Sequence, residues 1–532
     1  MKKFKFISLL LTLAMIIMLI GCGGNSTDSN TADKPSDTNT AEKTDSDNTD
    51  RYIRMVTKQD LTSLDPHKEN DTASAPAVRS IYETLVKLDH NTNEFYPYLA
   101  ESYEYVEGSD KDIKFKLHEG VKFHNGDPLT SEDVKFSFER QKSSGNVGHL
   151  VAQIDSVEII DDYNFILHLT EPTSTIFSSL SHMGCSILPH KYVEKMDSEN
   201  KSLDEAPVGT GPFVYDGWVL GSKWSLKKNE NYWNDKFEAQ CAGIECSVIP
   251  EETARTVALQ TGEADLLLDV PNVDIQNIRD DANLDLLKYD STALEFFALN
   301  CSKAPFDNKD LREAVAYCVN RDDIIQVQFQ GEATPCYATM APVALGYTDD
   351  VVKREYDIEK AKQKLKDAGM PDGFSFTVIA TGDVRARACQ VLQAACKKAG
   401  IDVKIEMLEK SAFYDKIGNG THEAAASGWN ANAEPDNTFR PLFSSTTIAS
   451  GGFNSSCFKS DEIDKLLAEG SVAIDPKEKL EKYQDIAKVC ARECINVPTC
   501  SENGYIAKSK KIDGMIISSI RMHDFYGLHF VK

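Results

Sequence analysis

Residues 115–134 read FKLHEGVKFHNGDPLTSEDV, and this stretch carries the strongest structural signals of the chain. It begins inside a run, Ile113 to Leu117, in which apolar and polar side chains alternate as in a strand with one buried face. Asn125-Gly126-Asp127-Pro128 has the composition of a tight turn. A helix is expected from Ser131, with Thr130 as N-cap and two acidic residues in the first turn, where the helix dipole favours them. The stretch therefore predicts a strand, a turn and a helix in succession.

The same alternation of strands and helices continues along the rest of the chain. A strand is expected at Tyr52 to Thr57 and a helix near residues 77–85. Farther on, the pattern predicts a helix at 356–368, a strand at 374–379, a helix at 386–399 and a strand at 403–407. Strands that alternate with helices in this way are typical of an α/β architecture.

The first fifty residues indicate export and a lipid anchor. Three lysines precede an apolar run from Ile7 to Ile20, which has the length of a secretory signal. The run is shorter than the roughly 20 residues of a spanning helix, so we expect cleavage rather than retention as an anchor. The run ends in Leu-Ile-Gly-Cys, similar to the processing site of bacterial lipoproteins, which implies acylation of Cys22. Residues 1–21 are then a signal peptide, and residues 22–50, rich in Ser, Thr, Asn and Asp, a disordered acidic tether.

Composition limits the partners of the remaining chain. The hydrophobic content of 41% supports a large globular body of two or three domains. The formal net charge of −25 argues against nucleic acid or an anionic membrane surface as a partner, because both would be repelled.

Twelve cysteines follow Cys22 among the thirteen of the chain. Export permits disulfides, whereas several of these cysteines, such as Cys318 and Cys396, lie in apolar helical patterns where a thiol behaves as a small buried hydrophobe. Their spacing does not match a zinc site. Disulfides and free thiols both stay open, and no metal site is predicted.

The chain contains no convincing catalytic pattern. His422-Glu423 begins like a zinc-protease helix, but no second histidine follows at the required spacing. Gly209-Thr210-Gly211 is followed by a proline, which lacks the N–H that a phosphate cradle needs. We predict neither catalytic residues nor a cofactor, and keep a surface hydrolase as the alternative from another functional class.

Several motifs together resemble one family. Residues 115–134 are close to the signature of the extracytoplasmic solute-binding proteins of the peptide, opine and nickel class, family 5, of bacterial ABC importers. Further motifs follow in the order of that family: Pro207-Val208-Gly209-Thr210-Gly211-Pro212-Phe213, Asn231-Tyr232-Trp233, Gly262-Glu263-Ala264-Asp265, Ala304-Pro305-Phe306-Asp307, Leu311-Arg312-Glu313-Ala314, Asn320-Arg321 and Gly428-Trp429. The resemblance extends from Arg51 to the end of the chain.

The resemblance implies a two-lobe periplasmic-binding-protein fold of type II, the Venus-flytrap fold, with an extra domain inserted in lobe I. Lobe I would comprise residues 51–80, 189–290 and 500–532, the inserted domain residues 81–188, and lobe II residues 291–499. Members of the family close around a solute, because a ligand that bridges both lobes stabilises the closed form.

The function implied is that of a monomeric, lipid-anchored receptor on the extracytoplasmic face of the bacterial cell membrane. It would deliver a short peptide or a peptide-like solute to an ABC permease. A nickel chelate or an opine as solute, and a sensor or adhesin on the same scaffold, stay open as alternatives.

The resemblance also suggests ligand contacts. In peptide-binding members, an aspartate three residues after the tryptophan of a Gly-Trp pair binds the α-ammonium of the ligand; the chain has Asn432 there. Glu434 and Asp436 are candidates for a replacement charge, with a role in a turn as the alternative. Trp429 is expected to form an aromatic wall of the cleft, and Asn430 and Asn432 are expected to make polar contacts with the ligand.

Two further positions are expected from the family. Asp65 lies in a Ser-Leu-Asp-Pro loop that often faces the cleft in relatives, although the loop also has the composition of a structural turn. Dipeptide binders carry an arginine for the ligand carboxylate on the strand near 378–381, where this chain has none. We expect Arg385 and Arg387 on the following helix, exposed to solvent.

If the missing charge at Asn432 excludes peptides with a free amino terminus, Asn432→Asp should strengthen their binding. A buried carboxylate makes a stronger, charge-assisted pair with an ammonium than a neutral amide does. Calorimetric titration of the variant with free-amine peptides measures the effect, and an unchanged affinity would rule out this explanation.

Overall fold

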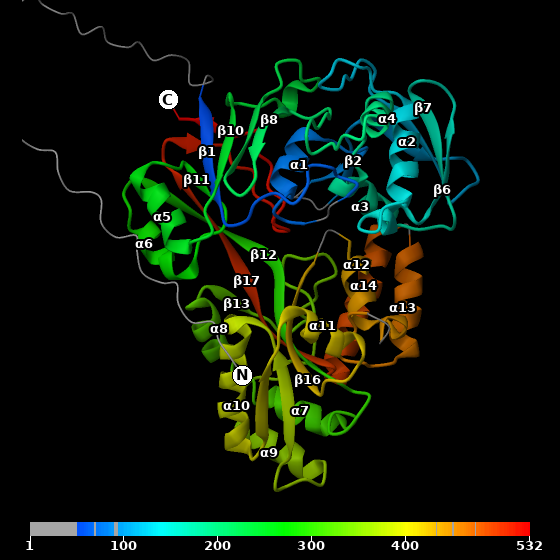
Figure 1. Ribbon diagram of the computed structural model, residues 1–532. Helices are drawn as coiled ribbons and strands as arrows, with labels where there is room; N and C mark the ends of the chain where they lie inside the picture. Colours follow the sequence, from blue (N-terminus) through cyan, green and yellow to red (C-terminus); the bar gives the residue numbers. More distant parts are fainter. Residues whose placement is uncertain are drawn as a thin grey trace, which may run out of the picture. The chain divides into compact units, whose positions relative to one another are not determined.

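The computed structural model describes residues 51–68, 71–89, 94–431, 434–448, 452–473 and 475–531 (Figure 1). The predicted signal peptide, the tether, Cys22 and Asn432 lie outside the described residues. Within the described part of the chain, no helix has the length and apolarity needed to cross a membrane.

One large sheet forms the framework of the protein. Its strand order is β15-β14-β16-β12-β17-β11-β1-β10-β9-β8, and β13 also pairs with β17. In chain order the strands are β1 Tyr52–Thr57, β8 Phe213–Val219, β9 Lys223–Lys228, β10 Gly243–Val248, β11 Leu266–Leu267, β12 Leu284–Leu299, β13 Ala333–Pro335, β14 Ser375–Ala380, β15 Asp402–Met407, β16 Ala424–Asn430 and β17 Asn496–Ser509.

The two longest strands, β12 and β17, belong to both halves of this sheet. The first half of β12 pairs with the second half of β17, and the register then shifts between Asp290 and Leu294. Beyond the shift, β12 pairs with β16, whereas β11 pairs with β17 only at the opposite end. Figure 1 shows β12 and β17 running side by side from one group of strands to the other. This antiparallel pair therefore connects the two halves of the framework.

A separate four-stranded sheet has the order β4-β5-β7-β6. Its strands are β4 Ala100–Tyr105, β5 Asp112–Leu117, β6 Ile154–Ile159 and β7 Asn164–Leu169. Two short hairpins complete the strands: β2 Val86–Leu88 with β3 Phe95–Pro97, and β18 Ile512–Asp513 with β19 His529–Phe530.

Helices surround these sheets. They are α1 Ala75–Ile81, α2 Ser131–Lys142, α3 Ile176–Ser181, α4 His190–Ser198, α5 Glu252–Thr261, α6 Ile275–Arg279, α7 Lys309–Tyr317, α8 Arg321–Phe329, α9 Ile358–Asp367, α10 Gly382–Ala399, α11 Lys410–Gly418, α12 Asp436–Phe443, α13 Asp461–Val472 and α14 Pro476–Glu493. Short 3₁₀ helices lie at Gly148–Val151, Met183–Cys185, Asp235–Phe237, Asn272–Asp274 and Ser445–Thr447.

The strand, turn and helix predicted for residues 113–134 are confirmed as β5, a turn and α2. Gly126 has φ +91°, a left-handed conformation that only glycine adopts without strain. At the start of α2, the Asp133 carboxylate accepts hydrogen bonds from the backbone N–H and the hydroxyl of Thr130, at 2.8 and 3.0 Å. The cap therefore involves the residues expected from the sequence.

The other expected elements agree with the structure within two residues, except for the end of the first helix and the start of the helix expected at 386–399. The strands β1, β14 and β15 match within one residue. The helix expected to continue to residue 85 stops at Ile81, because Tyr82 is extended and the Ile81 carbonyl accepts a hydrogen bond from Gly211 instead. The helix expected from residue 386 begins earlier, at Gly382, so that Arg385 lies in its first turn.

Two of the sequence motifs meet at a buried carboxylate, Glu83, which is 1% exposed. The Thr210 hydroxyl and the Trp233 indole N–H donate to its Oε2 at 2.8 and 2.9 Å, and the Tyr232 hydroxyl donates to its Oε1 at 2.5 Å. Burial raises the pKa of Glu83, against the effect of Lys87 and these donors. The motifs at 207–213 and 231–233 therefore join the chain around Glu83 rather than contact a solute.

Four main hydrophobic cores lie under these elements. One lies between α7, α9, α10 and strands β12 and β14 to β16, a second under β1 and β8 to β11, a third beneath the four-stranded sheet, and a fourth under α12 to α14. All described residues belong to one compact unit. The residue boundaries expected for the lobes and the inserted domain stay predictions.

The described cysteines form no disulfide: all twelve carry free thiols, and eleven are buried. Cys318 and Cys396 belong to the first core. Of the two alternatives left open by the sequence, the structure has the free thiols, which pack as small apolar side chains.

Gly209→Ala should destabilise the protein by about 1–3 kcal/mol or more, because its Cβ would lie 2.1 Å from the backbone oxygen of Ile81. Gly145→Ala is the matched control, since nothing lies within 4 Å of its Cβ position. Urea unfolding of both variants gives the comparison. Equal midpoints would contradict the close packing of Gly209 against α1.

Candidate functional site

Three adjoining cavities lie along the junction of the two halves of the large sheet, and we call them together the cleft. The first, of about 200 Å³, is lined by residues of both halves, among them Met55, Tyr289 and Asn430. The second, of about 410 Å³, shares Arg79 and Met522 with the first. The third, of about 380 Å³, shares Lys58, Leu268, Asp269, Tyr289 and Arg521 with the first. The three cavities therefore adjoin one another, and the first and third have walls from both halves of the sheet.

An ion pair between Glu295 of β12 and Arg385 of α10 lines the third cavity. The guanidinium donates two hydrogen bonds to the carboxylate, at 2.9 and 2.8 Å. Burial raises the pKa of Glu295, and the pairing with Arg385 offsets this only in part. The pair leaves Arg385 a quarter exposed, so one edge of the guanidinium is open to the cleft.

Gly428 makes room for this pair. A Cβ at Gly428 would lie 2.2 Å from the Glu295 carboxylate and 2.5 Å from Arg385. The glycine of the Gly-Trp motif therefore allows an ion pair to lie directly on β16. The expectation that Arg385 is a solvated helix residue is wrong, because the early start of α10 directs it onto Glu295. Arg387 donates instead to the backbone oxygen of Val327 at 2.8 Å.

Asn430 lies in the cleft as expected: it is exposed at the end of β16 and lines the first cavity. Trp429, its neighbour, is half-buried and packs edge-to-face with Phe453, with ring centroids 5.6 Å apart. Phe453 and Tyr414 are 45% and 41% exposed and also contact each other edge-to-face. Trp429 thus belongs to a partly exposed aromatic group on β16 and its surroundings, and it does not line the three cavities described here.

The structure brings Asp65 to a different place from the one expected. Asp65 is fully buried, and the Arg140 guanidinium of α2 donates to both of its oxygens, at 2.9 and 2.6 Å. Burial opposes ionisation, but the hydrogen bonds and charge of Arg140 outweigh it and lower the pKa of Asp65. Asp65 thus ties its loop to α2 and does not line the cleft cavities.

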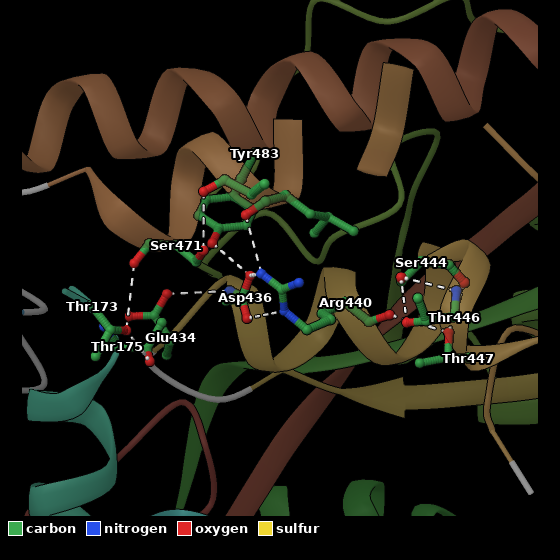
Figure 2. A network of polar contacts seen from close by, with 12 residues as sticks. Thr173, Thr175, Glu434, Asp436, Arg440, Ser444, Thr446, Thr447, Ser471 and Tyr483 are labelled. Atoms are coloured by element: carbon green, nitrogen blue, oxygen red, sulfur yellow. Dashed lines mark hydrogen bonds and ion pairs between the residues drawn. The ribbon is translucent and has the colours of Figure 1, made fainter. Parts of the chain in front are cut away.

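Glu434 and Asp436 are both paired inside the protein (Figure 2). Glu434 is 1% exposed and forms an ion pair with Lys479. Asp436 accepts hydrogen bonds from the Arg440 guanidinium at 2.6 and 2.8 Å and from the Tyr483 hydroxyl at 2.8 Å. Asp436 lines the second cavity, but its charge is already matched there by Arg440. Neither carboxylate is left over for a ligand ammonium.

The segment 173–175, which precedes α3, forms hydrogen bonds with residues close to Glu434 and Asp436. Ser471 accepts a hydrogen bond from the backbone N–H of Ser174 at 2.9 Å, and Lys479 donates to the Ser174 carbonyl at 3.3 Å. Figure 2 shows Thr173 and Thr175 beside Ser471 and Glu434. These hydrogen bonds connect the segment before α3 to α13 and α14, next to the second cavity, which α3 and α12 line.

Sequence reasoning missed Glu295, Arg79, Lys87 and Arg521, all of which line the cleft. A signal existed for Glu295, because a single carboxylate interrupts the apolar run of β12. Arg79 and Lys87 carried no comparable pattern. Among the described residues no group of three or more His, Cys, Asp or Glu side chains has the arrangement of a metal site.

Residues 94–450 of the chain match the bacterial extracellular solute-binding proteins, family 5. The chain belongs to this family. The two-lobe periplasmic-binding-protein fold is thereby established, with β12 and β17 as the strands that connect the halves.

Relatives of this solute-binding protein cover nearly the whole chain. Heme-binding protein A of Haemophilus influenzae is 30% identical over 480 residues, 85% of this chain and 87% of that protein. The dipeptide-binding protein of Escherichia coli is 28% identical over 485 residues, 86% of this chain and 89% of that protein. DppA of Helicobacter pylori, solved with the peptide STSA and associated with an ABC transporter, is 29% identical with a TM-score of 0.75, covering 91% and 98% of the two chains.

Glu295→Gln should lower the stability of the binding protein by about 2–3 kcal/mol, because it leaves the largely buried Arg385 without its counter-charge. Glu295→Gln with Arg385→Met should recover part of this loss, since both charges are then removed. Urea midpoints of the two variants measure the effect. Glu252→Gln is the control, because Glu252 lies on the exposed surface of α5 and should change stability by less than about 0.5 kcal/mol.

Proposed function

We propose that this protein captures a short peptide or peptide-like solute in the cleft and delivers it to the permease of an ABC importer. The observation that carries the proposal is the row of three adjoining cavities, of which the first and third have walls from both halves of the large sheet. Along the strand order these halves are joined only through β12 and β17. A solute that contacts both walls stabilises the closed arrangement by its differential affinity. The permease can then distinguish the loaded protein from the empty one.

Two comparisons support a peptide as the solute. One relative is named a dipeptide-binding protein, and another was solved with a bound tetrapeptide. The ion pairs along the cleft fit such a solute. A peptide carries both an ammonium and a carboxylate, which can bind the carboxylates and guanidinium groups of these pairs.

The family and the first fifty residues of the sequence support a proposal for the location. Family 5 proteins act outside the cytoplasm. We propose that Cys22 carries the lipid anchor, that residues 22–50 hold the binding domain away from the membrane surface, and that the protein works as a monomer. Residues 51–80, 189–290 and 500–532 then form lobe I, 81–188 the inserted domain and 291–499 lobe II; the register shift of β12 at residues 290–294 lies at one of these boundaries.

A thermal-shift screen of the purified protein tests the proposed solute. Pooled peptides with free ends should raise the melting temperature, because a ligand at a hundredfold excess over its dissociation constant adds about 2.7 kcal/mol of stability. Blocked peptides, nickel with and without histidine, opines and hemin are screened in parallel, hemin because one relative is named for heme. A shift with one of these and none with peptides would contradict the peptide proposal.

A further inference from the structure

The second cavity differs from the third in its balance of charge. The third is lined by four cationic side chains and four carboxylates: Lys58, Arg255, Arg385, Arg521, Glu252, Asp269, Glu295 and Glu502. The second is lined by three cationic side chains, Arg79, Lys87 and Arg440, and by one carboxylate, Asp436. The first cavity has a similar excess, with Lys58, Arg79 and Arg521 against Asp269, and it shares Arg79 with the second.

Lys87 is the clearest element of this excess. Its Nζ lies 4.1 Å from the centre of the Tyr98 ring, with the Phe237 and Tyr526 rings farther out at 5.7 and 5.9 Å. The closest of these contacts is the cation–π contact with Tyr98, and the carboxylates of Asp524 and Glu83 also act on the Lys87 charge. Burial lowers the pKa of Lys87, against the field of Asp524. Lys87 is half-buried, and an anion that reaches its ammonium would stabilise the charged form.

Arg79 lines both the first and the second cavity, and only part of its hydrogen-bonding capacity is used. Its Nη2 donates to Asp524 at 3.1 Å, whereas its buried Nε has no hydrogen-bond partner among the described residues. The side chain is 14% exposed, so the guanidinium reaches the cavity with donors to spare.

Neutral donors complete the wall. His182 accepts a hydrogen bond from the Gly184 N–H at its Nδ1, at 3.0 Å, which assigns the proton of the neutral ring to Nε2. Burial lowers the pKa of His182 to about 4, so the ring is neutral at pH 7. The hydroxyls of Thr175, Ser178 and Ser181 line the same cavity. These groups can donate to an oxyanion without adding charge.

We propose that the second cavity binds a carboxylate of the solute, with Lys87 and Arg79 as its counter-charges and His182 as a hydrogen-bond donor. The inference rests on the proposed function and narrows it to solutes with an acidic group. The opposite wall is α12, with Arg440 already paired to Asp436. A carboxylate held there also touches the half of the protein that carries α12, so its binding contributes to closure.

Three peptide pools test this and identify the source of the carboxylate: tetrapeptides with a free C-terminus, the same pool amidated, and an amidated pool in which each peptide contains a glutamate. Apparent dissociation constants are measured by titrated thermal shift on the purified protein. If the terminal carboxylate fills the cavity, amidation should weaken binding at least tenfold, and the glutamate pool should stay weak. If an acidic side chain fills it, the glutamate pool should recover the affinity.

Lys87→Met should remove this discrimination, because it keeps the length of the side chain and removes its charge, whereas Lys87→Arg should retain it. Lys114→Met is the matched control, since Lys114 is exposed on β5 of the neighbouring sheet. If Lys87→Met does not fold, the affinities of the three peptide pools for the unaltered protein still test whether the cavity binds a carboxylate.

Two results would contradict the inference in different ways. If free and amidated pools bind the unaltered protein equally and Lys87→Met changes neither, the peptide function stands and the carboxylate site is wrong. If no pool shifts the melting temperature, the proposed peptide function fails and the carboxylate site fails with it.

Discussion

The structure depends on the antiparallel pairing of β12 with β17. Along the strand order of the large sheet, this pair alone connects β16, β14 and β15 with β11, β1 and β10 to β8. A register shift between Asp290 and Leu294 interrupts the pair at the junction of the halves, and a second shift follows between Glu295 and Phe296. Backbone hydrogen bonds resist sliding of the strands, while a local break in register permits bending and twisting. The cleft lies at this junction, and its residues Tyr289 and Glu295 flank the first shift.

Charge is arranged in this cleft as pairs that are already formed. Glu295 with Arg385 and Glu502 with Arg521 face the third cavity, and Asp436 with Arg440 faces the second. Preformed pairs avoid the large cost of leaving single charges buried in the empty protein. Lys87 differs from these pairs, because its ammonium lies over the Tyr98 ring.

The candidate site was predicted from the sequence only in part. Asn430 lines the first cavity, at the end of β16 that the Gly-Trp motif locates, and its contact with a ligand stays a prediction. Asp65, Glu434 and Asp436 were chosen as carboxylates near expected loops, yet each is held by a cation, Arg140, Lys479 or Arg440, that is close in space. Arg385 was assigned to solvent, because its partner Glu295 lies 90 residues away in sequence. Ion pairs between distant residues leave no local pattern by which a single sequence can reveal them.

The sequence by itself determined the α/β alternation, the strand, turn and helix of residues 113–134, and the order of motifs that defines the family. These features depend on side-chain periodicity, turn chemistry and helix capping, which act over a few residues. Only the tertiary structure decided where α1 ends, which carboxylates are paired, that the described cysteines are free, and that Arg79, Lys87 and His182 share a cavity. The physical reason is that burial and charge compensation depend on neighbours in space, and chain folding brings those neighbours together from distant segments.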